Sequence, residues 1–385
     1  GATNVADTLT LSGVISGGYG ITKIGAGTVI LSGANTYTGT TNINVGTLKL
    51  TGSLAPSTSV VMIGTSVWDL QAAQTIASLV MASGNSITRS AGASSLMVSG
   101  TSTLANSITT SGAQTYTGAV ILAANTALTG TAINFTSTVD SNATTSQSLT
   151  LTNSGTVTFS GVVGGTTNLA SITTDAGGTV SIGGNVTTTG AQTYNDAVTL
   201  AAATTFSSSS FTTGSTLAAS TYALTITTDA IALGGNVTGS GALVIQPKTA
   251  TTTVGLGTSA AGSLSLDDTE LARLQDGFSS ITIGSTTGTG AIAVDYGTSY
   301  TFTDPLTIRS ASSGGGAITV SDALNTGANN LTITTGGAVS LAAVTSGTLA
   351  VTGTGITLNG DVTTSGTQTY TGAVTLGNSI TASST

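Results

Sequence analysis

The chain is a succession of short segments in which apolar and polar residues alternate. Residues 148–153 (SLTLTN), 223–229 (ALTITTD) and 330–335 (NLTITT) place an apolar side chain at every second position. This period of two is typical of half-buried β-strands, because successive side chains of a strand point to opposite faces of its sheet. Gly and Asn separate the segments, so the sequence predicts many short strands joined by tight turns.

Internal repeats give these strands a regular spacing. Residues 109–122, 187–200 and 363–376 align without gaps around a G-x-Q-T-Y core, and residues 32–39 (SGANTYTG) form a shorter relative. The aligned tyrosines are separated by close to multiples of roughly 20 residues, and a period near 26 fits less evenly. The alignment singles out the tyrosines and the amide side chain two residues before each: Tyr37, Tyr116, Tyr194, Tyr370, Asn35, Gln114, Gln192 and Gln368.

Short strands at a fixed repeat, without helices between them, predict an all-β fold of the β-solenoid type. Each turn of the backbone path, or coil, takes about 20 residues and stacks on the previous coil about 4.8 Å away. Leu, Ile and Val fill the inside, while Thr and Ser stack outside without charge repulsion. We expect one continuous solenoid over residues 1–385.

One stretch has a helical pattern. In residues 265–280 (SLDDTELARLQDGFSS), Asp267 or Asp268 can cap a helix and Glu270 falls in its first turn. The sequence predicts a short helical excursion near residues 267–276. The functional alternatives for these three carboxylates, a Ca²⁺ site or a catalytic pair, are disfavoured because capping gives them a sufficient role and no calcium-loop pattern surrounds them.

Residues 52–100 are less repetitive than the rest. They hold the only Trp, two of the three Met, and Arg89. We expect either less regular coils or a local insertion in this part of the solenoid.

Composition removes several function classes. Only 5% of the residues are charged, and the chain has neither Cys nor His. Disulfides, Cys or His metal sites and imidazole catalysis are therefore excluded, and we expect no cofactor. The net charge of −8 opposes nucleic-acid binding, and apolar stretches are too short for a membrane-embedded chain.

Residues 12–50 resemble the passenger-associated repeat of bacterial autotransporters, whose pattern is K-x-G-x-G-x-[LVI]-x-L-[ST]-G-x-N-x-Y-x-G followed by G-T-L-x-L. The "G-[AT]-Q-T-Y" and "G-G-N-V-T" units are similar to those of large exoproteins related to filamentous haemagglutinin. These resemblances imply a right-handed parallel β-helix that is exported and displayed outside the cell or on the bacterial surface as a rod or adhesin. The matching positions of the passenger repeat are Lys23, Gly25, Gly27, Leu31, Gly33, Asn35, Tyr37, Gly39, Gly46, Leu48 and Leu50.

The repeat tyrosines and amides admit two interpretations. They could form a row that contacts glycans, or they could stabilise the coil corners. We favour the second, with the amides bonded to turn backbone or to each other and the tyrosine hydroxyls at the surface. T-x-T elements such as Thr225/Thr227 and Thr332/Thr334 are scattered among Ser, Ala and Gly variants, which disfavours a regular ice-binding face.

The predicted function is a structural and adhesive rod of a secreted surface protein, and not an enzyme. Strand-like sequence begins almost at the first residue and continues to the last repeat, which predicts either an internal stretch of a longer chain or copies stacked into a fibre. The alternative is an adhesin that contacts a host surface or glycan through insertions at 52–100 and 265–280. A pectate-lyase-like enzyme is disfavoured, because Arg309 and Lys248 lack a nearby carboxylate cluster in the sequence.

Overall fold

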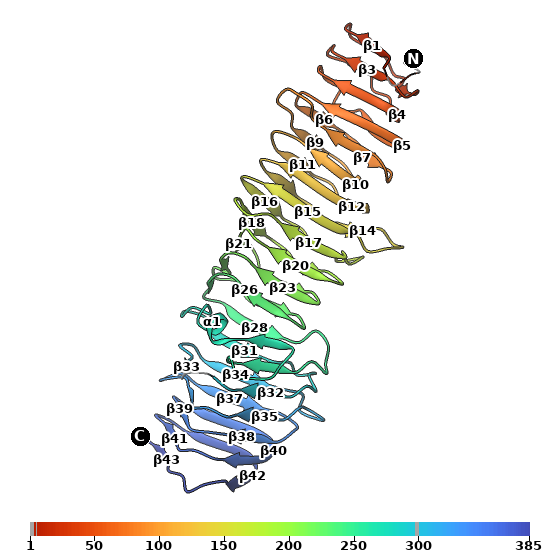
Figure 1. Ribbon diagram of the computed structural model, residues 1–385. Helices are drawn as coiled ribbons and strands as arrows, with labels where there is room; N and C mark the ends of the chain where they lie inside the picture. Colours follow the sequence, from red (N-terminus) through yellow and green to blue (C-terminus); the bar gives the residue numbers. More distant parts are fainter. Residues whose placement is uncertain (1–3, 5, 297–299) are drawn as a thin grey trace. The chain divides into compact units, whose positions relative to one another are not determined.

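The computed structural model describes residues 4, 6–296 and 300–385 and is an all-β parallel solenoid with coils of roughly 20 residues (Figure 1). The predicted fold class is therefore confirmed. The chain divides into two compact units, residues 1–198 and 199–385, which are described in turn. That one continuous solenoid runs over residues 1–385 stays a prediction.

The strands that begin in the first unit are β1 (Thr8–Leu11), β2 (Ile21–Lys23), β3 (Thr28–Leu31), β4 (Thr41–Leu50), β5 (Ser59–Leu70), β6 (Gln74–Ile76), β7 (Ser78–Met81), β8 (Ser86–Thr88), β9 (Leu96–Val98), β10 (Ser102–Thr109), β11 (Gln114–Tyr116), β12 (Val120–Gly130), β13 (Ile133–Phe135), β14 (Val139–Ser141), β15 (Ser148–Asn153), β16 (Thr156–Phe159), β17 (Ser171–Thr174), β18 (Thr179–Ile182), β19 (Val186–Thr187), β20 (Ala191–Tyr194) and β21 (Ala197–Leu200).

Parallel, in-register pairing in the first unit stacks like positions of successive coils. On β11, β13 and β16, Tyr116 lies opposite Phe135, and Phe135 lies opposite Phe159. Their rings are stacked, with centroids 5.4 Å and 5.0 Å apart, and all three side chains are buried. Because every second residue of a strand points inward, this register converts the alternating pattern of the sequence into a continuous core.

Residues 52–100 wind in the same way as their neighbours. Ser59 of β5 lies opposite Ser78 of β7, and Leu79 lies opposite Ser102 of β10. Trp68, the only Trp, is completely buried between Leu48 and Ile87 of the adjacent coils. This stretch therefore contributes ordinary layers to the core.

The elements that begin in the second unit are β22 (Thr204–Ser207), β23 (Ser210–Thr213), β24 (Leu217–Ala218), β25 (Leu224–Thr227), β26 (Ile231–Leu233), β27 (Val237–Thr238), β28 (Ala242–Gln246), β29 (Val254–Leu256), β30 (Leu264–Leu266), α1 (Asp268–Leu271), β31 (Ser280–Ile283), β32 (Ile292–Val294), β33 (Tyr300–Thr301), β34 (Leu306–Arg309), β35 (Ile318–Val320), β36 (Leu324–Asn325), β37 (Leu331–Thr334), β38 (Val339–Leu341), β39 (Val344–Ser346), β40 (Leu349–Leu358), β41 (Val362–Thr364), β42 (Gln368–Leu376) and β43 (Ala382–Ser384).

In one outward row of the second unit, threonine occupies six of eight positions. Its side chains stand on consecutive paired strands, so β-branched hydroxyl residues stack on one another with no charge among them. The sequence suggested scattered T-x-T elements, but pairing across loops of unequal length brings them into one row. In order along the sheet, the row is Thr205, Thr225, Val244, Thr282, Thr307, Thr332, Ala350 and Thr369.

The helical excursion exists but is shorter than predicted. Helix α1 spans four residues, Asp268–Leu271, instead of about residues 267–276. Strand pairing ends it: the Val237 N–H donates to the carbonyl of Arg273, and the Gln275 N–H donates to the carbonyl of Val237. The backbone after the first helical turn thus returns to pairing with the preceding coil, and Leu271 is buried beneath it.

Phe135 tests the importance of the stacked core. Phe135→Ala should remove its two ring contacts and leave a cavity that the paired coils cannot close, destabilising the first unit by about 3–5 kcal/mol. Phe135→Leu, which retains most of the volume, should cost less than about 1.5 kcal/mol. Denaturant titration combined with hydrogen exchange on residues 114–182 measures both, since repeat arrays need not unfold in one step. Equal costs for the two variants would contradict the stacking account.

Candidate functional site

The G-x-Q-T-Y repeat forms a buried corner in the first unit. Gln114 lies inside the coil, and its side-chain amide donates to the carbonyls of Ile108 (3.1 Å) and Thr129 (2.9 Å). The hydroxyl of Tyr116 donates to the Gln114 Oε1 atom at 2.8 Å. The corner also holds Thr110, whose hydroxyl donates to the carbonyl of Gly112 at 2.8 Å. Backbone groups that face inward at the turn thereby gain partners without water.

The same arrangement recurs at residues 188–194. Thr188 donates to the carbonyl of Gly190 at 2.8 Å, Gln192 donates to the carbonyl of Val186 at 3.0 Å, and Tyr194 donates to Gln192 at 3.3 Å. Gln192 and Tyr194 are completely buried. The repeated letters of the sequence therefore encode one hydrogen-bonded corner.

A third corner, in the second unit, is built from Gln368 and Tyr370. Thr364 donates to the carbonyl of Gly366 at 2.6 Å, and Tyr370 donates to Gln368 at 3.1 Å. The Gln368 amide also donates to the carbonyl of Ser383 at 2.8 Å. Here Gln368 and Tyr370 are only half-buried.

Asn35 and Tyr37 form a variant of the corner. The Asn35 amide donates to the carbonyls of Gly33 (2.9 Å) and Ser53 (3.0 Å), and its Oδ1 atom accepts the N–H of Ile15 at 3.0 Å. The hydroxyls of Tyr37 and Thr41 lie 2.6 Å apart. The shorter Asn side chain does not reach the tyrosine, so a threonine takes the place of the amide oxygen.

The prediction of surface hydroxyls is wrong for Tyr37, Tyr116 and Tyr194, which are completely buried. Each lies two residues after an inward amide and so shares its inward face, where the hydroxyl finds a partner in the core. Burial raises the pKa of the Tyr116 and Tyr194 hydroxyls, so both stay protonated. Buried side chains of this kind cannot serve as a platform for glycans.

Sequence reasoning missed the threonine that completes each corner. Thr110, Thr188 and Thr364 are buried, and each donates to the carbonyl two residues later. Their signal was present in the alignment, because the three occupy the same column. In so Thr-rich a chain, however, a shared Thr does not stand out.

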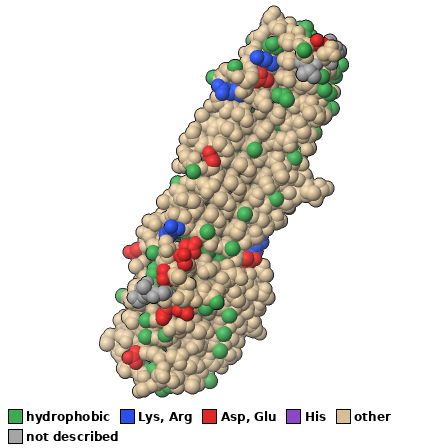
Figure 2. All heavy atoms as spheres, viewed as in Figure 1, with side chains coloured by type: hydrophobic (Ala, Val, Ile, Leu, Met, Phe, Trp, Pro, Cys, Tyr) green, Lys and Arg blue, Asp and Glu red, His purple; other side chains and the backbone are tan. Residues whose placement is uncertain are grey.

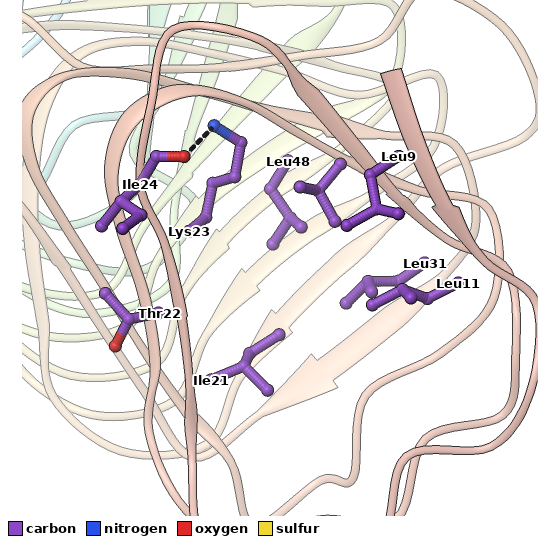
Figure 3. Close-up of a pocket in the computed structure, with 9 residues that line it drawn as sticks. Leu9, Leu11, Ile21, Thr22, Lys23, Ile24, Leu31 and Leu48 are labelled. Atoms are coloured by element: carbon purple, nitrogen blue, oxygen red, sulfur yellow. Dashed lines mark hydrogen bonds between the residues drawn. The ribbon is translucent and has the colours of Figure 1, made fainter. Parts of the chain in front are cut away.

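The passenger-repeat lysine is also an internal residue. Lys23 is 3% exposed, and its ammonium donates to the carbonyls of Ile24 (3.1 Å), Gly25 (2.6 Å) and Val45 (2.8 Å), as Figure 3 shows for the first of them. Burial lowers the pKa of Lys23 from its ordinary value. Because Val45 belongs to the next coil, Lys23 ties two coils together through backbone oxygens.

The glycine of the G-T-L segment permits this close approach. Gly46 has a φ of +72°, and a Cβ atom on it would lie 2.5–2.7 Å from the carbonyl oxygens of Gly25, Ala26 and Gly27. Only glycine fits such a position. Beside this turn, an apolar cavity of about 300 Å³ opens between β1, β2 and β3, with Leu31 and Leu48 in its wall (Figure 3).

The carboxylates of the excursion are bound to backbone amides. Asp267 Oδ1 accepts the N–H of Glu270 at 2.8 Å, and Glu270 Oε2 accepts the N–H of Asp267 at 3.1 Å, which makes a reciprocal capping box. Glu270 Oε1 accepts the N–H of Leu233 at 2.9 Å, and Asp268 Oδ1 accepts that of Thr258 at 3.1 Å. Glu270 therefore attaches the excursion to the preceding coil and Asp268 attaches it to the loop after β29, while Asp267 caps the helix.

The described residues form neither a cluster of metal ligands nor a membrane-spanning helix. No group of three or more Asp, Glu, His or Cys side chains is placed to hold a metal ion. No helix is long and apolar enough to cross a membrane. Charged side chains are few and scattered on the face shown in Figure 2. Any recognition by this surface depends mainly on uncharged groups.

Gln114 tests the corner. Gln114→Ala should destabilise the first unit by about 3 kcal/mol or more, since it leaves several buried groups, including the Tyr116 hydroxyl, without their partner at about 1–3 kcal/mol each. Adding Tyr116→Phe should recover part of that loss. The matched control is Gln246→Ala. The half-buried side chain of Gln246 donates one hydrogen bond, to the Thr227 hydroxyl at 3.0 Å. Equal shifts in the denaturant midpoint for Q114A and Q246A would refute the role of the corner.

Asp304 and Asp229 should give opposite pH dependences. Burial raises the pKa of Asp304, whose Oδ1 accepts the N–H of Gly277 at 3.1 Å. At Asp229 burial acts in the same sense, but four hydrogen bonds from residues 248–252 outweigh it and lower the pKa. A raised pKa gives stability that is present below pH 3.8 and lost as pH rises, whereas a lowered pKa gives stability that is lost as pH falls.

The quantity to compare is the thermal midpoint of each variant minus that of the parent chain. For Asp304→Asn this difference should be more positive at pH 7 than at pH 4, and for Asp229→Asn it should be more negative at pH 7 than at pH 4. Melting curves of both variants and the parent at these two pH values measure the difference. A common sign for the two variants would show that burial and hydrogen bonding do not control these carboxylates as described.

Part of the chain is similar to known proteins. Residues 21–50 match the family model of the passenger-associated-transport-repeat. A 44-residue segment is 54% identical to the adhesin BmaC autotransporter of Brucella suis biovar 1 (strain 1330), and it covers 11% of this chain and 1% of that adhesin. No solved structure matches the chain significantly. The repeat, the similarity to an autotransporter adhesin and the parallel solenoid fold together fit an autotransporter passenger repeat.

Proposed function

We propose that the chain is a structural and adhesive segment of a secreted bacterial surface protein. The observation that carries the proposal is a passenger repeat whose lysine and glycines are built into the coils of a solenoid with few charged residues. Secretion to the cell surface follows from the passenger repeat and from the autotransporter name of the relative. In this role the segment extends from the cell surface and makes contact with other surfaces.

The solenoid suits this role because its length grows with each coil. Every coil adds about 4.8 Å while repeating the same hydrogen bonds, so a stiff element is obtained from a chain with a thin core. Outward rows of Thr and Ser carry no charge that would repel a second copy or a host surface. We therefore include self-association, by stacking or lateral contact, in the proposed function.

A non-catalytic role is part of the proposal. The carboxylates of residues 267–270 are engaged with backbone amides, and the amides and tyrosines of the repeats are engaged with one another. Side chains held in such bonds maintain the coils and are poorly placed to exchange protons with a substrate.

An adhesin that binds through its loops is the second candidate. Residues 52–100 form ordinary coils, with Ile63, Val80 and Met97 exposed on their outer faces, and are therefore no separate insertion. In the excursion, the apolar side chains Leu271, Leu274 and Phe278 are buried and are not available for contact. The loop that follows β14, at residues 142–147, projects from the first unit and favours this second candidate instead (Figure 1).

Display on a non-adherent laboratory bacterium tests the proposal. The full chain, fused to a translocator, should increase aggregation of the cells or their attachment to cultured host cells several-fold over cells that display the translocator alone. A variant with residues 142–147 replaced by Gly-Gly separates the two candidates. Aggregation by the coils should survive this change, whereas attachment through the loop should be lost. Displayed chain that settles and attaches no better than the translocator control would reject the proposed function.

A further inference from the structure

Two consecutive coils of the first unit are longer than their neighbours. Val120 lies opposite Val139, a step of 19 residues, whereas Val139 lies opposite Val163, a step of 24. The next step, from Val163 to Val186, takes 23 residues. The additional residues leave the solenoid as loops at 142–147 and 164–168, both next to β14, so a step in the surface forms where the shorter coil meets the longer ones.

A groove of about 460 Å³ lies at this step. Its floor is Ile121 of the shorter coil, which is 45% exposed, and its walls carry Thr138, Asp140, Asn142 and Thr166. A cavity of this size, with an apolar floor and a few polar groups, has the dimensions of small-ligand sites, about 300–1,000 Å³.

Hydrogen bonds fix the walls of the groove. Asp140 Oδ1 accepts the N–H groups of Thr166 (2.8 Å) and Thr167 (3.2 Å) from the second loop. Asn142 Oδ1 accepts the N–H of Thr145 at 2.9 Å, and its amide donates to the carbonyl of Ala123 at 3.1 Å. Because these groups are positioned before any ligand arrives, binding would cost little loop ordering.

The lining selects a chemical class of ligand. Both bonds to Asp140 end on Oδ1, which leaves Oδ2 to accept from a ligand hydroxyl. No Lys or Arg lines the groove, so an anionic ligand would meet an unbalanced carboxylate. A peptide cannot add here as a strand, because Ile121 is already paired with Thr103 on one side and with Asp140 on the other.

We propose that this groove binds a neutral sugar residue of a glycan, with the apolar face of the ring on Ile121 and its hydroxyls on Asp140 and the wall threonines. The proposal rests on the adhesive function above and names its ligand class. A neutral, hydroxyl-rich ring with one apolar face meets all three features of the groove: the aliphatic floor, the single carboxylate and the absence of cations.

Saturation-transfer NMR on the full chain tests the groove. The probes are free neutral hexoses and N-acetylhexosamines, with sialic acid as the anionic control and a neutral tripeptide as the peptide control. At least one neutral sugar should receive saturation, and sialic acid and the tripeptide should not. Asp140→Asn, which retains an oxygen for Thr166 and Thr167, should weaken that binding at least about tenfold.

Matched variants separate binding from folding. Ile121→Ala should weaken binding several-fold, whereas Val80→Ala should leave it unchanged, since Val80 is similarly exposed (40%) but lies outside the groove. Binding is compared only among variants that melt within a few degrees of the parent, and I121A remains informative if D140N does not fold. No saturation of any neutral sugar, preferential saturation of the tripeptide or sialic acid, or unchanged binding by both groove variants would overturn the proposal.

The display assay distinguishes this failure from failure of the proposed function. If cells that display D140N attach as well as cells that display the parent chain, adhesion stands and the groove is not its site. If the parent chain itself confers neither attachment nor aggregation, the proposed function fails independently of the groove.

Discussion

Parallel, in-register pairing between successive coils is the constraint on which the rest of the structure depends. It places the same position of each coil about 4.8 Å from its counterpart, so any property of a side chain is repeated along a row. Rings stack on rings in the first unit, and threonines stack on threonines in the second. Charges of one sign would repel in such rows, which accounts for a chain with only 5% charged residues.

The corners solve a second problem that this pairing creates. A coil must turn several times within about 20 residues, and inward-facing backbone groups at the turns are shielded from water. The buried amides of Gln114 and Gln192, and the ammonium of Lys23, donate to such carbonyls directly. The passenger repeat and the G-x-Q-T-Y units thus both supply hydrogen-bond donors to inward-facing carbonyls at the turns. This structural role accounts for their residues without ligand binding.

The sequence predicted the fold well because the fold is a local pattern repeated. Alternation of period two and the spacing of the tyrosines were sufficient for a parallel solenoid of about 20-residue coils. The spacing of two residues places each repeat tyrosine on the same face as the amide before it, but the sequence does not show that this polar face points into the core, where the two side chains bond to each other. The length of α1 failed for a similar reason: the pairing of Val237 with the chain near Leu274 ends the helix, and that contact is invisible in the local pattern.

Surface features were harder still to predict. The threonine row depends on which coils are long, because Val244 pairs with Thr282 across the whole excursion. The groove beside β14 depends in the same way on surplus residues at 142–147 (NATTSQ) and 164–168 (GGTTN), whose short polar sequences do not differ visibly from the other turns of the chain. Loop length decides what a solenoid presents outside, while strand pattern decides what it holds inside.

Solid-state NMR on the uniformly labelled chain measures the inter-coil register most directly. The account predicts cross-peaks between residues that face each other on adjacent coils, such as Phe135 with Phe159 and Thr307 with Thr332, from backbones about 4.8 Å apart. Cross-peaks that instead join strands close in sequence, in the antiparallel order of hairpins, would contradict it.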